Sequence, residues 1–415
     1  MNDILPDVSG TWRYLESVVR DIVQSYGYAE IRLPLLEHTE LFRRSIGEVT
    51  DIVEKEMYTF EDRNGESLTL RPEATASVVR AGLTNGLLHN QRQKLWTAGP
   101  MFRYEKPQKG RYRQFYQFDV EALGFEGPDV DAELIIMCAR LWRELGISNI
   151  ALQINSLGTP ASRSRYRETL VEYFTGVKNQ LDDDSIRRLE QNPLRILDSK
   201  NPEMQDIVAG APVMVDYLDD ESARHFRGLE ELLETAGVAY TVNPRLVRGL
   251  DYYSRTVFEW VTDALGSQGA VCSGGRYDGL VEKLGGKPTP AVGWAMGIER
   301  FVALYDACGG TAPANDVDVY VVAVGQRTLE QAFAIAEQLR DAVDGITVEV
   351  NLGGGSFKSQ MKRADKSNAR FALILGEQEI ADQRAGLKPL RSAEDQTSIA
   401  FADLPAAMSA KLGKA

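Results

Sequence analysis

Two strand-like segments follow one another in this chain with only a short basic loop between them. Residues 94–104 and 114–123 have strand patterns, and the residues that join them are rich in lysine and arginine. Parallel neighbours need a crossover of a dozen or more residues, whereas antiparallel neighbours can be joined by a short turn. Because there is no room for a crossover helix, this half of the chain is predicted to fold around a mainly antiparallel sheet.

Other patterns divide the chain into parts. Residues 1–310 mix strands and helices, and within them 162–236 is charged, helical in pattern and poor in strands, which predicts an inserted helical module. Residues 305–316 are mostly small and include the helix- and strand-breaking residues Gly309, Gly310 and Pro313, which predicts a linker. Residues 317–415 then alternate strand and helix, the pattern of a small α/β domain with a largely parallel sheet. The fold class that follows is an α+β domain with a mixed, mainly antiparallel sheet, a helical insertion and a C-terminal α/β domain.

Composition narrows the class of protein. The 415 residues are 43% apolar and 26% charged, which is ordinary for a globular chain. No run approaches the roughly 20 apolar residues of a membrane span, and the first residues lack the pattern of a signal peptide. We therefore expect a cytoplasmic protein with no membrane partner. The net charge of −13 argues mildly against nucleic acid as a partner, although local basic clusters can override it.

Cysteine and histidine usage gives little support to metal or nucleophilic chemistry. Both residue types are few and widely separated in the sequence: Cys138, Cys272, Cys308, His38, His89 and His225. This spacing excludes a fully paired disulfide scaffold and any Cys-x-x-Cys knuckle. We assign no metal to protein side chains.

The segment 247–260 places one arginine and two adjacent tyrosines before an apolar alternation that is typical of a strand. Adjacent strand residues point to opposite faces, so Tyr252 and Tyr253 are expected to line different walls. Arg248 carries a permanently charged planar group suited to phosphate or carboxylate, and Gly249 permits close backbone approach. On this segment alone, a half-buried strand with a surface arginine and a binding site are both open interpretations.

Two basic clusters stand out against the acidic whole. Residues 103–113 contain five cations, and a second cluster follows the glycine run 353–355. That run lies between a predicted strand and a predicted helix, but it lacks the glycine before lysine of a nucleotide P-loop. Lys358, Lys362 and Lys366 recur every four residues and so share one helix face. That face could contact the phosphates of a nucleic acid, or it could simply be a cationic surface exposed to solvent.

These motifs together resemble the class II aminoacyl-tRNA synthetases, and among them the histidyl-tRNA synthetase family, over nearly all of the chain. The motifs that carry the resemblance are the segment around Pro34 (class motif 1), Arg103-x-Glu105 with its loop (motif 2), Leu246–Thr256 and Ser273–Gly279 (two signatures peculiar to the histidine enzymes) and Gly293–Arg300 followed by Phe301 (motif 3). Family members usually begin a little earlier with a basic segment, which leaves open a start upstream of Met1.

The resemblance implies a homodimeric ligase. It would join L-histidine to histidine tRNA through a histidyl-adenylate, with ATP as a substrate, Mg²⁺ expected on the triphosphate, and AMP and pyrophosphate as products. Residues 1–310 would be the catalytic domain and residues 317–415 the anticodon-binding domain.

The resemblance also implies residues for ATP. Arg103 and Arg248 would be catalytic, because the five-coordinate α-phosphorus needs preorganised cations. The full set expected at ATP is Arg103, Glu105, Arg111, Arg248 and Arg300. Arg300 begins a predicted helix, where the helix dipole also favours phosphate.

Histidine recognition needs groups that distinguish the two imidazole nitrogens, since neutral imidazole has one donor and one acceptor. The family residues that do this match Glu121 and Tyr253. The complete set expected at histidine is Glu73, Ala74, Thr75, Gln117, Glu121, Tyr252 and Tyr253. The family commonly has glycine where this chain has Ala74, so the backbone there is expected to differ slightly. The residues expected at tRNA are Lys106, Lys109, Arg113, Lys358, Lys362 and Lys366.

Two alternatives belong to other functional classes. One is a non-catalytic, synthetase-like regulatory subunit of histidine biosynthesis, and the other is a histidine- or tRNA-sensing module. Regulatory chains of that kind tend to lose the arginine signature and the terminal domain, and this chain has both.

Overall fold

The computed structural model describes residues 2–47, 50, 52–106, 110–199, 201–266, 269–312 and 317–414. It contains two compact units, Met1–Ala312 and Pro313–Ala415, and each is considered by itself. Within the described ranges, no helix is long and apolar enough to cross a membrane.

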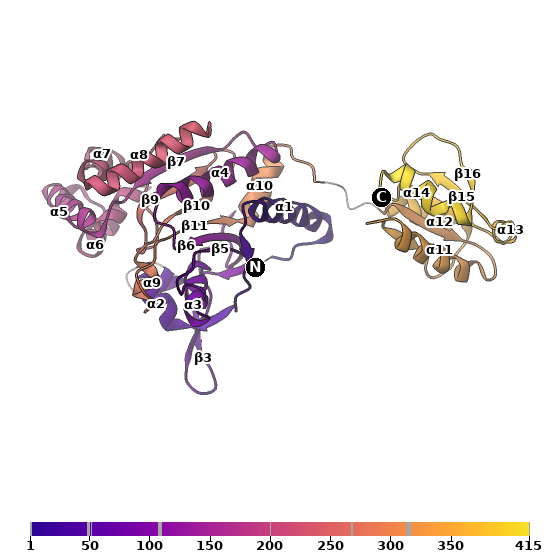
Figure 1. The fold of residues 1–415 in the computed structure, drawn as a ribbon, viewed down its shortest axis with the longest axis horizontal. Coiled ribbons are helices and arrows are strands. Elements are labelled where there is room, and N and C mark those ends of the chain that lie inside the picture. The colour runs from indigo at the N-terminus through magenta and orange to yellow at the C-terminus, as the bar shows by residue number, and fades with distance from the viewer. Residues whose placement is uncertain are drawn as a thin grey trace. The chain divides into compact units, whose positions relative to one another are not determined.

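An eight-stranded sheet is the centre of the first unit (Figure 1). Its strands, in spatial order, are β1 (Ala29–Glu30), β5 (Gln93–Phe102), β6 (Gln114–Leu123), β11 (Ala291–Gly297), β10 (Ala270–Arg276), β9 (Ser254–Val261), β7 (Ala151–Ser156) and β8 (Thr241–Val242). Only the outer pairs β1–β5 and β7–β8 are parallel. The predicted hairpin is formed by β5 and β6, which pair antiparallel along their whole length. The expectation of a mixed, mainly antiparallel sheet is therefore confirmed.

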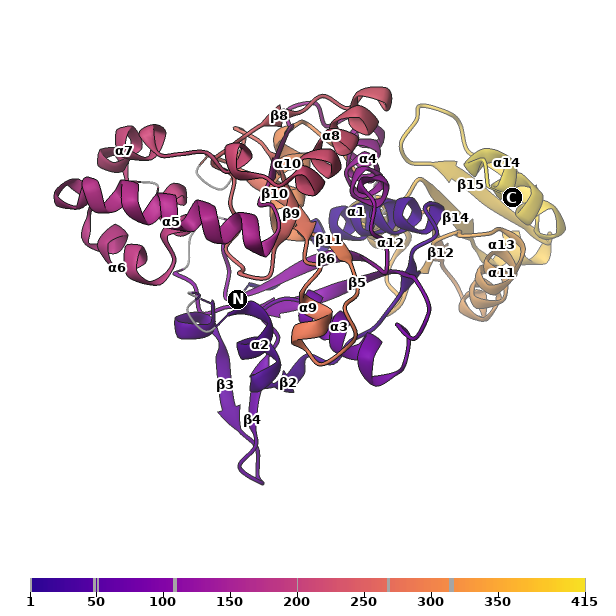
Figure 2. The same cartoon turned by 60° about the vertical axis from the view of Figure 1, so that its left-hand side comes forward.

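The two faces of this sheet are covered differently. One face carries the main apolar core, closed by α1 (Pro6–Ser25), α4 (Pro128–Glu144), α8 (Asp220–Thr235) and α10 (Ile298–Ala307). On the other face lie α3 (Thr75–Thr84) and α9 (Leu280–Lys283) (Figure 2). A three-stranded sheet of β2 (Leu36–His38), β4 (Ser67–Leu70) and β3 (Tyr58–Glu61) adjoins them, together with α2 (Thr39–Ile46).

The stretch predicted as a helical insertion is helical in the structure, but it serves two cores. α5 (Pro160–Gly176), α6 (Asp183–Gln191) and α7 (Gln205–Gly210) form a small core of their own. α8 instead packs into the main core and against α4, where His225 Nε2 and Asp131 Oδ2 are 2.8 Å apart. Figures 1 and 2 show α5 to α7 grouped at one end of the unit.

The second unit has a five-stranded sheet with the order β13 (Val348–Val350), β12 (Val319–Ala323), β14 (Phe371–Leu375), β15 (Arg384–Pro389) and β16 (Thr397–Ala400). The first three strands are parallel, as expected from the alternation of strand and helix. The last two, which the sequence patterns did not predict, are antiparallel, so the sheet is mixed. α11 (Thr328–Ala342) and α14 (Leu404–Leu412) cover one face, and α12 (Phe357–Lys366) covers the other, while α13 (Glu377–Ala381) follows β14.

The two ends of the predicted linker, 305–316, can be compared with the structure only in part. α10 extends to Ala307, so the first residues of the predicted linker 305–316 are helical. Its last four residues, 313–316, lie outside the described residues.

Candidate active site

A cavity of about 230 Å³ opens over β6, β10 and β11 in the first unit. Its lining comes from segments far apart in the sequence: the turn before α3, the β5–β6 hairpin, the residues before β9, and the start of α10. The predicted site residues that line it are Glu73, Thr75, Arg103, Glu105, Arg111, Gln117, Arg248, Tyr252, Tyr253 and Arg300. The folded chain thus brings ten separately predicted side chains to one cavity.

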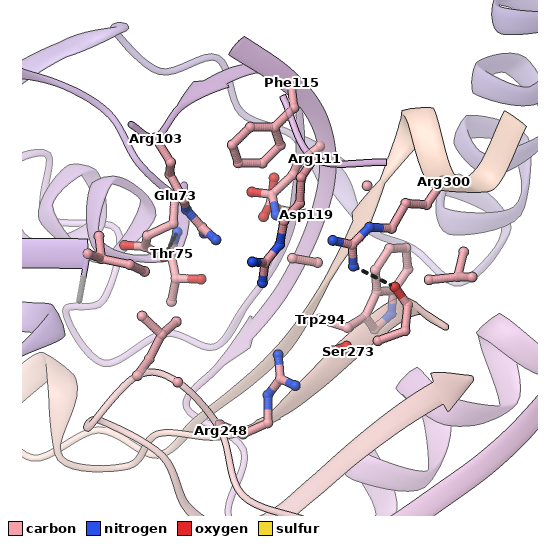
Figure 3. A pocket seen from close by; sticks show the side chains of 18 of the residues that line it. Glu73, Thr75, Arg103, Arg111, Phe115, Asp119, Arg248, Ser273, Trp294 and Arg300 are labelled. Atoms are coloured by element: carbon pink, nitrogen blue, oxygen red, sulfur yellow. Dashed lines mark hydrogen bonds between the residues drawn. The ribbon is translucent and has the colours of Figure 1, made fainter. Parts of the chain in front are cut away.

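Four arginines enter this cavity from different directions. Figure 3 shows the guanidinium groups of Arg103, Arg111, Arg248 and Arg300 pointing into the space between them. Burial, together with the nearby charge of Arg111, lowers the pKa of Arg300. Cations held this close repel one another, so the arrangement is favourable when a polyanion lies between them.

Hydrogen bonds or ion pairs hold each of these arginines in place. Arg103 Nε donates to Pro72 O at 2.8 Å, and Arg300 donates to Gly110 O at 3.0 Å and to Ala270 O at 2.9 Å. Arg111 forms an ion pair with Glu105, 2.9 Å between Nε and Oε2. Arg248 forms an ion pair with Glu259 on β9. The cations are therefore oriented before any ligand arrives, as electrostatic catalysis requires.

Three buried carboxylates gather at the other end of the cavity. Glu73 caps α3: its Oε2 accepts from Thr75 N and its Oε1 from Ala76 N, both at 2.9 Å. Glu121 accepts from Thr75 Oγ1 at 2.6 Å and from the hydroxyl of Tyr277. The third carboxylate is Asp119, which the sequence patterns did not single out and which lines the cavity.

Burial dominates the ionisation of these carboxyl groups. It raises the pKa of Asp119 to about 8, and the nearby charge of Glu73 adds to the rise. It also raises the pKa of Glu121 to about 8, although the hydrogen bonds from Thr75 and Tyr277 act in the opposite direction. Carboxyl groups of this kind ionise more readily when a cation binds beside them.

Strand alternation explains why β6 carries so much of the site. Gln117, Asp119 and Glu121 lie two residues apart and share one face of the strand. The residues between them, Phe118 and Val120, are buried in the main core on the opposite face. One strand therefore supplies both the core and the polar end of the cavity.

Glu121 itself does not line the cavity, because it is almost completely buried behind Thr75 and Tyr277. The side chain of Glu121 fits there because Gly293, on the neighbouring strand β11, has no side chain of its own. A Cβ at position 293 would lie 1.7 Å from Glu121 Oε2 and 2.6 Å from Val120 O, so no larger residue fits there. The motif 3 glycine thus has a packing role toward Glu121.

The expectation that Tyr252 and Tyr253 line different walls is wrong. β9 begins at Ser254, so both tyrosines precede the strand and are not bound by its alternation. Both line the cavity, with their ring centroids 4.8 Å apart, and Tyr252 OH donates to Glu73 Oε2 at 3.4 Å.

Ala74 does not line the cavity either; it is fully buried at the start of α3. Its φ of −101° lies in the ordinary right-handed region. Glycine's conformational freedom is therefore not required at this position, and the substitution costs the backbone nothing here.

The residues expected at tRNA that the structure describes do not line this cavity. Lys106 is exposed, Lys109 lies outside the described residues, and Arg113 stacks over Tyr104 with 3.9 Å between its Cζ and the ring centroid. Lys358, Lys362 and Lys366 are all exposed on α12, whose opposite face buries Gln360 and Ala364. The shared lysine face on that helix is therefore present and open to solvent.

The signature Ser273–Gly279 also supplies two residues to which the sequence patterns gave no role. Tyr277 donates to Glu121, as described above. Arg276 is fully buried; it donates to Asp131 at 2.8 Å and to the carbonyl oxygens of Phe125 and Gly127. Arg276 therefore ties β10 to the start of α4, a structural role that no local pattern indicates.

A mainly antiparallel sheet with inward arginines from a hairpin and from a strand–helix junction is the architecture of the class II aminoacyl-tRNA synthetases. The model of the histidyl-tRNA synthetase family matches residues 1–301, and that of an anticodon-binding domain matches residues 318–411. The chain belongs to the histidyl-tRNA synthetase family.

Solved structures agree with this assignment. The apo histidyl-tRNA synthetase of S. aureus is 35% identical, with a TM-score of 0.82 and coverage of 98% of both chains. The enzyme of Nostoc sp. is 22% identical, with a TM-score of 0.74 over 99% of this chain and 98% of that one. A Bacillus halodurans protein described as an ATP phosphoribosyltransferase regulatory subunit/histidyl-tRNA synthetase is 23% identical, with a TM-score of 0.64 over 90% and 96%. The last two likenesses concern the fold alone.

Proposed function

We propose that this chain ligates L-histidine to histidine tRNA. Histidine and ATP would form histidyl-adenylate and pyrophosphate, and the acyl group would then move to the terminal adenosine of the tRNA, releasing AMP. The observation that supports this most is the common cavity of Arg103 and Arg248, with buried carboxylates at its opposite end. One end suits a polyphosphate, and the other suits a cationic amino group.

The arginines would act on the phosphates. The histidine carboxylate attacks the α-phosphorus, and negative charge grows on its oxygens as the fifth bond forms. Arg103 and Arg248 would stabilise that charge, while Arg300 would hold the far end of the triphosphate near the start of α10. Phe115, which lines the same cavity, offers an aromatic face to the adenine, with Glu105 and Arg111 beside it.

Recognition of the imidazole would fall to Glu121 and Tyr253. Tyr253, which lines the cavity, would donate to one ring nitrogen, and Glu121, which lies behind Thr75 and Tyr277, would accept from the other once one of these two hydroxyl groups gives way. Because Glu121 is held by Thr75 and Tyr277, its carboxylate is oriented in advance.

Mg²⁺ is expected to arrive on the triphosphate. In the part of the chain that the structure describes, no group of three or more His, Cys, Asp or Glu side chains is placed to hold a metal ion. The protein's own contribution to charge neutralisation would therefore come from its arginines.

The remaining proposals rest on the family. We propose that the protein is a cytoplasmic homodimer. Residues 1–310 would form the catalytic domain, into which residues 162–236 are inserted. Residues 305–316 would link this domain to residues 317–415, which would bind the anticodon arm. The motif 2 loop would meet the acceptor end of the tRNA.

Histidine-dependent exchange of pyrophosphate into ATP tests the enzymatic proposal. The purified chain of 415 residues should catalyse exchange with L-histidine and with none of the other nineteen amino acids at a comparable rate. If correctly folded protein shows no exchange, the chain is not a ligase.

A regulatory subunit of histidine biosynthesis is the second candidate, because a structure with that description shares the fold. The retained arginines and the domain matched at 318–411 favour catalysis over regulation. A regulatory subunit would bind histidine without any exchange activity.

The lysine face of α12 gives a prediction about tRNA. Replacing Lys358, Lys362 and Lys366 with glutamine should weaken tRNA binding and reduce its salt dependence by about one unit of log–log slope per lysine, because fewer counterions are released. Filter binding of histidine tRNA across a salt series measures this. The matched control is Lys388→Gln, which replaces an exposed lysine on β15. An unchanged slope in the triple variant would show that the lysine face of α12 does not contact tRNA.

A further inference from the structure

The segment 248–253 supplies both tyrosines and one arginine to the cavity, yet it belongs to no helix or strand. Because β9 begins only at Ser254, the carbonyl oxygen of Tyr253 lies outside the strand ladder. The carbonyl of a buried residue needs a donor from elsewhere in the protein. In the structure that donor is the guanidinium group of Arg163 on α5, in the helical module to which the sequence patterns gave no part in the site.

The guanidinium of Arg163 extends from a firmly tied part of the module. Arg163 lies in the first turn of α5, and the side chain of Thr159 caps that turn by accepting from Ser162 N. Asp219, the cap of α8, accepts from Thr159 Oγ1 and from Ser162 Oγ, both at 2.6 Å. The starts of the two helices are thereby bound together, which fixes the point from which Arg163 reaches the segment.

The same module also holds Asp251, two residues before Tyr253. Asn192, directly after α6, donates through Nδ2 to Asp251 Oδ1 at 3.1 Å. Burial raises the pKa of Asp251, although the charges of Arg195 and Arg163 oppose the rise. Burial likewise lowers the pKa of Arg163, and the charge of Asp251 opposes that change. The segment therefore provides both the acceptor and the counter-charge for Arg163.

A cavity of about 240 Å³ lies between the module and the segment. Arg163 and Arg195 line it from the module, and Asp251 and Tyr253 line it from the segment. Protein interiors are normally close-packed, with few voids of this size. Apolar packing therefore does not fix the segment here, and its position depends on the hydrogen bonds and ion pairs.

Arg255, two residues after Tyr253, shows that outside contacts shape the approach to β9. Its φ of 49° lies in the left-handed region, which is unfavourable for a residue with a side chain. Its N donates to Gly158 O at 2.9 Å, its O accepts from Leu157 N at 2.7 Å, and its guanidinium pairs with Glu221 on α8 at 2.6 Å. Such a conformation persists only where the surrounding contacts determine the backbone.

We propose that Arg163 is a positioning residue for the choice of amino acid: by holding the carbonyl of Tyr253, it sets where the phenolic hydroxyl of that tyrosine meets the substrate. This inference rests on the proposed function, in which Tyr253 donates to one imidazole nitrogen of histidine. It gives the helical module a part in selection, although none of its described residues lines the active-site cavity.

Arg163→Ala should raise the KM for histidine in pyrophosphate exchange by about 10- to 100-fold, the range for loss of a charge-assisted hydrogen bond. The KM for ATP should stay within about twofold, since Arg248 is tied separately to Glu259 on β9. Arg163→Lys keeps a cationic donor and should lose less than the alanine variant. Arg165→Ala, which removes an exposed arginine from the same helix, is the control and should change neither KM.

A double-mutant cycle with Tyr253→Phe separates positioning from general support of the fold. If Arg163 acts through the tyrosine hydroxyl, Arg163→Ala should raise the KM for histidine by no more than about twofold once that hydroxyl is absent. A purely structural role predicts instead that the two losses multiply. Should Arg163→Ala fail to fold, the same cycle with Arg163→Lys decides between these outcomes.

Multiplied losses in the cycle, equal rises in the KM for histidine and for ATP, or an unchanged KM for histidine in Arg163→Ala would each overturn the proposal. If the unmodified protein shows no histidine-dependent exchange, the proposed function itself fails, which is a distinct result.

Discussion

Replacing Arg248 with alanine should slow histidyl-adenylate formation about 10²–10³-fold, the typical loss when one preorganised transition-state donor is removed. Arg248 enters the cavity from the segment before β9, opposite the hairpin that carries Arg103. No other described residue supplies a guanidinium from that side of the cavity. Single-turnover formation of the adenylate measures the effect, and near-normal turnover would remove Arg248 from the mechanism.

The ion pair between Arg248 and Glu259 complicates this substitution and suggests its control. Without Arg248, the carboxylate of Glu259 is left uncompensated beside the phosphate end of the cavity. The double variant Arg248→Ala, Glu259→Gln removes that repulsion. It should recover ATP binding but not the rate of adenylate formation, which separates loss of a donor from gain of a negative charge. Arg140→Ala, a surface arginine on α4, should leave the rate unchanged.

Gly293→Ala is expected to have a comparably large effect on histidine use. The new methyl group would meet the carboxylate of Glu121 and the backbone of β6, so Glu121 must leave its hydrogen bonds with Thr75 and Tyr277. Overpacking of this kind typically costs 1–3 kcal/mol, about the same order as a lost buried hydrogen bond. The KM for histidine should rise by about 10-fold or more, far more than the KM for ATP.

Steady-state exchange kinetics at varied histidine and varied ATP distinguish these outcomes. Gly279→Ala is a matched control, because a Cβ at position 279 meets nothing within 4 Å and its φ is negative. Selective failure of histidine use in Gly293→Ala alone would support the role of Glu121. Equal losses for both substrates would mean that the sheet itself is distorted.

Local patterns were enough to predict the central hairpin, and the family resemblance supplied most of the predicted cavity residues. A short loop between two strands permits only one strand direction, and the strand predicted at 114–123 has those bounds in the structure. The arginines were identified because each stands in a motif that carries the family resemblance. Their roles in catalysis, like the predicted domain boundaries, stay predictions.

Features that depend on packing between distant segments were not predictable. α8 has the charged pattern of an insertion, yet it packs against α4, because Phe226 and Leu229 reach the main core. On α11, Leu329 and Phe333 are spaced to share a helical face with Ala336, but they are exposed, whereas Ala336 is buried together with Ala332 and Ile335. A helical repeat alone does not say which side of the helix meets the sheet.

Asp119 was missed for a related reason. A lone acid within a strand is usually solvent-exposed, and only the folded cavity reveals that this one is buried beside an unpartnered glutamine oxygen. The tyrosines were misplaced because strand alternation was applied to them, whereas β9 begins only at Ser254.

The strict alternation along β6 makes selectivity for the substrate inseparable from correct folding. A slip of one residue against β5 and β11 would turn Gln117, Asp119 and Glu121 toward hydrocarbon and send Phe118 and Val120 into the cavity. Such a misaligned sheet would bury three acceptors without donors, so it would be unstable as well as inactive. A chain misaligned in this way would therefore lose its stable fold together with the polar end of the cavity.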